Sequence, residues 1–76
     1  MRYRFANEKL REARKKLGLT LEQMTAGYRK HTGKKCFKQQ IHAWETGYSV
    51  PNANSLTNIL AIYKLIPENI FLPVEN

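Results

Sequence analysis

A short polar segment in the middle of the chain carries the side chains best suited to directional hydrogen bonding. It begins with Lys38, which is followed by Gln39 and Gln40. A lysine ammonium can donate to guanine O6 and N7, and a glutamine amide can pair with adenine N6 and N7 through two hydrogen bonds. His42 and Ala43 follow one helical turn on; if this segment is a helix in the major groove, they come within reach of a base or a thymine methyl group. These residues are candidates for reading DNA bases, and the alternative is an ordinary solvated helix face.

Positive charge is concentrated in and before this segment. The 76 residues include 13 Lys or Arg and 6 Asp or Glu, which gives a net charge of +7 and an isoelectric point near 9.9. Residues 1–38 hold twelve of the basic residues and three of the acidic ones. Such clustering is typical of a protein that binds a polyanion, and DNA, RNA and an anionic membrane surface are the candidates.

Length and composition exclude several classes of protein. A chain of 76 residues forms one domain with one small core. Its longest apolar run, residues 59–63, is too short to span a bilayer, and no apolar segment follows the first four residues. We therefore expect neither a membrane span nor a secretory signal. Because Cys36 is the single cysteine, we expect no internal disulfide and a reduced, cytoplasmic protein. If its polyanion is DNA, the protein is nucleoid-associated.

The side chains needed for catalysis or metal binding are not grouped in the sequence. No nucleophile–base pair, paired carboxylates or glycine-rich phosphate loop stands out, so we expect no enzyme, no cofactor and no small-molecule substrate. Zinc binding by His31, Cys36 and His42 lacks a fourth ligand and the usual spacing. We expect no metal site.

Five short helices are expected to position the polar segment. Thr20 and Gln23 fit a capping box at the start of the second helix. Asn7 and Asn52 are suitable N-caps for the first and fourth helices. No strand is convincing, so the sequence predicts an all-α domain. The expected helices are about 7–17, 21–28, 37–45, 53–63 and a short one opening at Pro67.

Apolar residues recur at helical spacing along these segments and define the expected core. Phe37, Ile41 and Trp44 follow one stripe of the third helix, so Trp44 is expected to be buried rather than to stack on a base. The expected core residues are Leu17, Met24, Tyr28, Phe37, Ile41, Trp44, Leu56, Ile59, Leu60, Tyr63 and Phe71.

Three fragments of the chain, in the right order, resemble the Cro/lambda-repressor-like helix-turn-helix family, also called the XRE family. The first is Arg14 with Leu17-Gly18-Leu19-Thr20, followed by Glu22 and Met24. The second is Ile41-x-x-Trp44-Glu45-x-Gly47, which resembles the end of the family's recognition helix. The third matches the family's last two helices and comprises Pro51, Leu56, Ile59, Leu65, Ile70 and Phe71.

The resemblance implies a five-helix lambda-repressor-like domain over residues 7–72, with its third helix in the major groove of DNA. A basic N-terminal arm (1–6) would precede this domain and a tail (73–76) would follow it. The arm could reach into a minor groove. Alternatively, Tyr3 or Phe5 packs against the first helix.

The resemblance also implies roles for individual side chains. Arg14 in the first helix is expected to form an ion pair with Glu45 and so to orient the third helix. Cys36 aligns with a core aliphatic position and is expected to be an inert, partly buried thiol. The residues expected to contact DNA phosphates are Arg29, Lys30, Lys34, Lys35, Tyr48, Ser49 and Asn52.

The sequence departs from the family pattern at two places. Leu21 stands where the family usually has a glutamine that contacts phosphate, so that contact is lost. Thr20 and Ile41 are 21 positions apart, about six more than is usual in this motif. Either the second or the third helix is longer by a turn, or a basic loop projects over residues 29–36, and Gly33 favours the loop.

The sequence therefore predicts a sequence-specific double-stranded DNA-binding transcriptional regulator, a repressor that binds a palindromic operator through the major groove. Because the short chain has no separate dimerisation domain, a homodimer would form through Ile66, Ile70, Leu72 and Val74. The alternative is a protein-interaction module of the same fold, such as an antitoxin or a phage protein that binds a host protein. RNA or membrane binding is disfavoured, because most aromatic residues fall on core stripes and the first helix has few large apolar residues.

Overall fold

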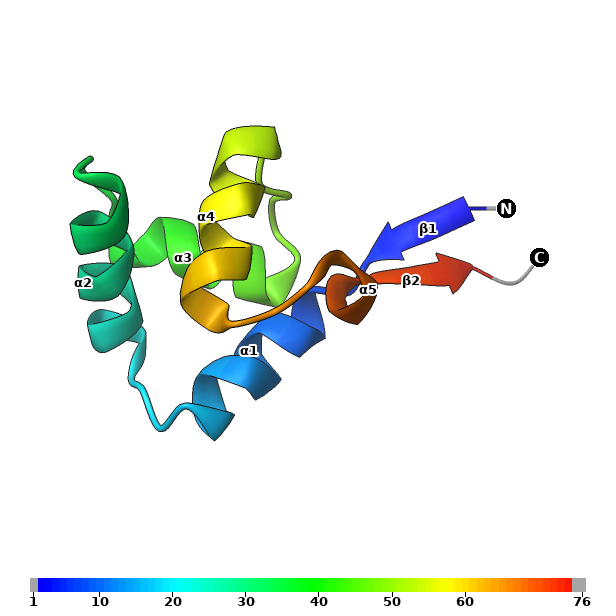
Figure 1. Cartoon of the computed structure of the whole chain (residues 1–76), viewed down its shortest axis with the longest axis horizontal. Coiled ribbons are helices and arrows are strands. Elements are labelled where there is room, and N and C mark those ends of the chain that lie inside the picture. The colour runs from blue at the N-terminus through cyan, green and yellow to red at the C-terminus, as the bar shows by residue number, and fades with distance from the viewer. Residues whose placement is uncertain (1, 75–76) are drawn as a thin grey trace.

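The computed structural model describes residues 2–74 as a mostly helical domain with one small sheet (Figure 1). The prediction of a mainly helical chain is confirmed, but the prediction of helices alone is wrong. No helix in the described part of the chain is long and apolar enough to cross a membrane. The elements are β1 (Arg2–Phe5), α1 (Asn7–Lys16), α2 (Leu21–Thr32), α3 (Lys38–Thr46), α4 (Ala53–Tyr63), α5 (Pro67–Ile70) and β2 (Phe71–Val74).

The two ends of the domain form an antiparallel ribbon that projects from the helices (Figure 1). Phe5 is opposite Phe71, and their rings meet edge to face with centroids 6.0 Å apart. The ribbon continues from a hydrogen bond in which the Ala6 N–H donates to the Ile70 carbonyl oxygen at 2.6 Å. Residues 2–5 are therefore not a free arm. Phe5 packs against the helical core, which agrees with the alternative that Tyr3 or Phe5 packs against the helices.

Part of the tail expected over residues 73–76 is an ordered strand, because residues 73 and 74 belong to β2. Pro73 is opposite Tyr3 and Val74 is opposite Arg2 in the antiparallel register. The sequence pattern missed both strands because each has four residues, too few for a clear alternation of apolar and polar side chains. The remaining residues of the expected arm and tail, 1 and 75–76, lie outside the described part of the chain.

Helix ends follow the local signals in the sequence. The Thr20 hydroxyl accepts from the Gln23 N–H, and the Gln23 side chain accepts from the Thr20 N–H, which confirms the capping box. Asn52 caps α4 by accepting from the Ser55 N–H at 2.9 Å. Asn7 does not cap α1: Ala6 occupies the N-cap position, which leaves the Asn7 side chain available for a tertiary contact.

The enlarged connection between the second and third helices is mostly helix. α2 runs to Thr32, one turn beyond the expected end near Tyr28, and Gly33 then ends it in the left-handed conformation (φ 68°). The prediction of a basic loop over residues 29–36 is therefore wrong. Nothing between Tyr28 and Gly33 breaks a helix, and the glycine acts as a C-terminal cap rather than as the centre of a loop.

The core lies between the helices and contains most of the expected residues. Met24, Tyr28, Ile41, Trp44, Ile59 and Tyr63 are buried, whereas Leu17, Leu56, Leu60 and Phe71 are partly buried against them. Phe37 is the exception, because 61% of it is exposed. It is the N-cap of α3, with an extended backbone (φ −104°, ψ 150°). Its side chain therefore leaves the apolar stripe that a helical conformation would have continued.

Candidate nucleic-acid interface

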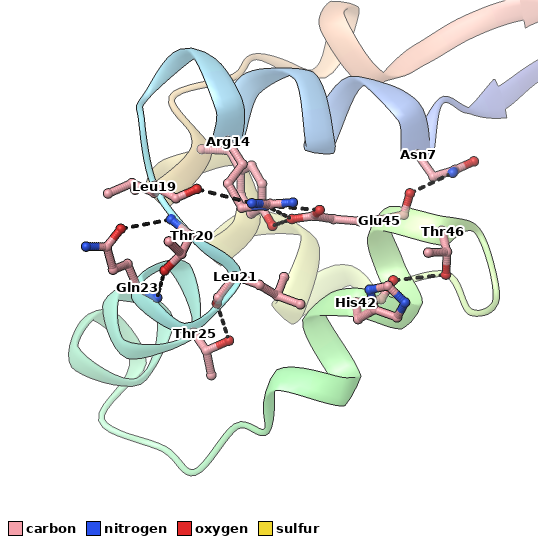
Figure 2. Close-up of polar contacts among 11 residues, drawn as sticks. Asn7, Arg14, Leu19, Thr20, Leu21, Gln23, Thr25, His42, Glu45 and Thr46 are labelled. Carbon is pink, nitrogen blue, oxygen red and sulfur yellow. Dashed lines mark hydrogen bonds and ion pairs between the residues drawn. The ribbon is translucent and has the colours of Figure 1, made fainter.

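The ion pair between Arg14 on α1 and Glu45 on α3 is present and buried (Figure 2). The Arg14 Nε–H donates to both carboxylate oxygens of Glu45, at 3.1 and 2.9 Å. Arg14 Nη1 also donates to the Leu19 carbonyl oxygen at 3.1 Å. The Glu45 side chain is only 3% exposed. The pair therefore joins α1, the connection before α2, and α3.

Two further side chains bind Glu45, and the sequence pattern revealed neither. The Tyr63 hydroxyl on α4 donates to Glu45 Oε2 at 2.7 Å. Burial raises the pKa of the Tyr63 hydroxyl above its ordinary value, and the hydrogen bond to the Glu45 carboxylate raises it further. The Asn7 side-chain amide donates to the Glu45 backbone oxygen at 2.8 Å. The only sequence signal was a tyrosine rather than a phenylalanine on an inner face, since a buried tyrosine hydroxyl usually finds a partner.

Glu45 is consequently the point where three helices meet. Arg14 comes from α1, Tyr63 from α4 and Glu45 itself from α3. The neighbouring residues Ile41 and Trp44 are buried on the same side of α3, and Trp44 packs on Tyr28 of α2 with ring centroids 5.7 Å apart. The inner face of α3 is therefore anchored to each of the three longer helices.

The outer face of α3 is polar and largely exposed. Lys38, Gln39, Gln40 and His42 are exposed, and Ala43 is half-buried beside them. The structure thus brings all five predicted base-reading residues onto the exposed side of one anchored helix. A helix presented in this way can enter a groove without unpacking the core.

Two predicted base-reading side chains already have partners. Gln40 Oε1 accepts from the Cys36 thiol at 3.9 Å, and Lys38 pairs with an acidic residue of α2. The Lys38 ammonium donates to Glu22 Oε1 of α2 at 2.9 Å, and both side chains are about half exposed or more. The hydrogen bond from Lys38 lowers the pKa of the Glu22 carboxyl. An exposed pair of this kind is weak, so Lys38 can exchange Glu22 for another acceptor. The sequence pattern did not indicate this pair, because its members belong to different helices.

The predicted phosphate-contacting residues divide into separate groups. Lys34, Lys35 and Asn52 line a cleft of about 200 Å³ together with Gln40. Tyr48 is 90% exposed, and Ser49 is exposed beside it in the turn after α3. These residues lie around the two ends of α3, where a helix in a groove is flanked by phosphates.

Arg29 differs from the rest of this set. Its Nε–H donates to the Cys36 carbonyl oxygen at 2.6 Å, so its guanidinium supports the connection between α2 and α3. Lys30 is exposed on α2. Cys36 is 1% exposed, and burial raises the pKa of its thiol, as expected of an unreactive core cysteine.

A mostly apolar hollow of about 320 Å³ separates the first turn of α2 from α3. Leu21, Lys38, Gln39 and His42 line it. Residues 2–74 contain no group of three or more His, Cys, Asp or Glu side chains placed to hold a metal ion.

No protein-family model matches this chain, and no curated protein and no solved structure matches it significantly. The function proposed for the protein therefore depends on its residues and their arrangement.

Proposed function

We propose that this protein is a sequence-specific double-stranded DNA-binding regulator of transcription, built as a lambda-repressor-like helix-turn-helix domain. In this proposal α2 and α3 are the two helices of the motif, and α3 is the recognition helix in the major groove. The supporting observation is the division of α3 into two faces. Its inner face is held by Trp44 and by the Glu45 network, while its outer face presents Lys38 and the two glutamines that follow it.

The charges around α3 support a nucleic acid as the partner. Lys34 and Lys35 lie just before the helix, and the capped N-terminus of α4 at Asn52 lines the same cleft. Cationic side chains and a helix N-terminus both attract phosphate. Operator occupancy that overlaps a promoter would exclude RNA polymerase, which is how we propose that the protein acts as a repressor.

We propose further that the protein binds a palindromic operator as a homodimer. Two copies would place their recognition helices about 34 Å apart, one turn of DNA. Ile70, which the sequence offered as a dimer contact, is fully buried and unavailable. Exposed apolar side chains remain at the ribbon end of the molecule, where Ile66 is 57% exposed and Val74 is 36% exposed. Sedimentation of the protein with and without operator DNA measures this stoichiometry.

The decisive experiment is selection of bound sequences from a random pool of duplex DNA, followed by titration of the selected site. We expect one enriched palindrome. Gln39→Ala should weaken binding to that site by about 1–3 kcal/mol and relax the preference at one base position. Binding to random DNA serves as the internal control and should be unchanged. If the variant kept the full sequence preference, Gln39 would not be a base-reading residue.

A protein-binding domain of the same fold, such as an antitoxin or a phage protein, is the second candidate. It is favoured by three large exposed apolar side chains next to α3: Phe37, Tyr48 and Val50 are 61%, 90% and 65% exposed. The salt dependence of binding to random DNA separates the two candidates. Micromolar binding that falls steeply with salt supports DNA binding, and its absence supports a protein partner.

A further inference from the structure

We propose that the hollow between α2 and α3 is a binding site for the 5-methyl group of a thymine in the major groove. The site is formed by Leu21 of α2 and by Lys38, Gln39 and His42 of α3. This inference rests on the proposed DNA-binding function and deepens it, because it names a base that the protein selects and a group on that base that it contacts.

Leu21 forms the α2 wall of the hollow and is held firmly. It is the first residue of α2, directly after the capping box of Thr20 and Gln23, and its carbonyl oxygen accepts from the Thr25 hydroxyl at 2.8 Å. Figure 2 shows its side chain extending from α2 toward the side of α3 that carries His42. Leu21 stands where the resembled family usually has a phosphate-contacting glutamine. In place of that polar contact, it supplies an apolar surface next to the proposed recognition helix.

The wall on the side of α3 is apolar for a specific reason. The Lys38 ammonium points to Glu22 Oε1 at 2.9 Å, or to a base or phosphate that replaces Glu22, and the methylene stem is the part that can line the hollow. His42 and Gln39 complete the lining, which is mostly apolar. A small apolar group is therefore a better occupant than a polar atom, which would lose its hydrogen bonds to water there.

The surroundings of the hollow favour a thymine over other apolar ligands. Lys38 lines the hollow itself, and Lys34 and Lys35 line a separate cleft at the start of α3. The surface of α3 around the hollow is therefore cationic and complements a phosphate backbone. Gln39 also lines the hollow, and its amide can hydrogen-bond a base edge. A T·A pair presents a methyl group on one base and the N6 and N7 atoms on the other. The hollow and the amide can consequently read the two bases of one such pair, or of adjacent pairs.

The test removes one methyl group from the DNA and nothing else. In the selected binding site, each thymine is replaced in turn by uracil, and the dissociation constant is measured for each duplex. We expect one thymine in each half-site at which uracil weakens binding by about fourfold per half-site, the effect of losing one buried methyl group. Restoring a methyl group at that position with thymine should restore the affinity.

A second variant connects the effect to the hollow. Leu21→Gln keeps the length of the side chain and suits a helix. Because Leu21 also packs against the core, circular dichroism first checks that the variant is folded. The folded variant should then show no difference between thymine and uracil. The matched control is Leu65→Gln, since Leu65 is also partly buried against the core but lies between α4 and α5, away from the hollow. That variant should retain the fourfold difference.

The outcomes separate this inference from the function on which it rests. If no duplex sequence is selected, both are overturned. If a sequence is selected but uracil has no effect at any thymine, or the site contains no thymine, the methyl site is wrong and DNA binding stands. Retention of the thymine preference in Leu21→Gln would likewise overturn the assignment to this hollow.

Discussion

Glu45 carries a buried negative charge that side chains of α1 and α4 help to satisfy. Arg14 supplies the opposite charge, and Tyr63 donates a hydrogen bond to the same carboxylate. In residues 2–74 no buried side-chain nitrogen or oxygen is left without a partner. Such a network costs desolvation energy, so we interpret it as a device that orients α3 rather than as a large source of net stability.

The Tyr63 hydroxyl can be removed with little change in shape. Tyr63→Phe should lower the free energy of unfolding by about 2 kcal/mol, because Glu45 loses a hydrogen bond to a charged group inside the core. Urea unfolding measures the change. Tyr48→Phe is the control, since Tyr48 is 90% exposed and should unfold like the wild type. Equal midpoints for both variants would contradict a structural role for the hydroxyl.

Stability at alkaline pH should depend on the same residue. The pKa of Tyr63 is raised in the folded state above its ordinary value of 10.0. The stability linked to its protonated hydroxyl is thus fully present below about pH 10 and is lost as the pH rises further. The wild type should lose its advantage over Tyr63→Phe above pH 10, by up to about 1.4 kcal/mol per pH unit. Parallel stability curves for the two proteins from pH 8 to 11 would contradict this.

The helices were the most predictable elements, because the signals that begin and end them are local. Thr20 with Gln23 begins α2, Asn52 begins α4, and Gly33 and Gly47 end α2 and α3 in the left-handed conformation. The error at the end of α2 came from reading Gly33 as the centre of a loop. A glycine in that conformation also ends a helix, and only the complete helix distinguishes the two roles.

Two glycines in different backbone conformations should respond in opposite ways to replacement by alanine, when the response is measured as the free energy of unfolding. Gly27 lies within α2 and has open space around an added Cβ atom, so Gly27→Ala should raise the free energy of unfolding by about 0.5–1 kcal/mol. Gly47 has φ 82°, and an added Cβ would lie 3.0 Å from Asn7 Oδ1. Gly47→Ala should therefore lower stability by about 1–3 kcal/mol. Thermal unfolding of both variants measures the two effects, and shifts of the same sign would show that backbone conformation does not control them.

At the scale of the whole molecule, the fold spreads the basic residues of the first half of the sequence over β1, α1, α2, the connection before α3 and the first residue of α3. Lys34 and Lys35 lie beside α3, whereas Lys15 and Lys16 are exposed on the last turn of α1. Only the first pair lies at the proposed interface. The net charge of the chain predicts affinity for a polyanion. The fold determines which basic side chains are placed where they can contact that polyanion.

This difference in placement can be measured through the dependence of DNA binding on salt. Replacing Lys34 and Lys35 by alanine should weaken binding to all sequences alike and reduce the slope of log K against log salt by about two, because two phosphate contacts are lost. The matched control replaces Lys15 and Lys16, which removes the same charge from α1. If both double variants reduced the slope equally, the effect would come from net charge rather than from contacts at α3.

The sequence by itself determined the mainly helical class, most of the core, the helix caps and the set of polar residues on α3, because these depend on neighbours within one or two turns. The Arg14–Glu45 pair could be predicted only through a family resemblance. Tertiary structure alone decided the pairing of β1 with β2, the exposure of Phe37, and the partners of Glu45 and Lys38. The Tyr63–Glu45 and Lys38–Glu22 contacts join residues 18 and 16 positions apart. No local pattern encodes such contacts, because the helices must pack before these side chains can meet.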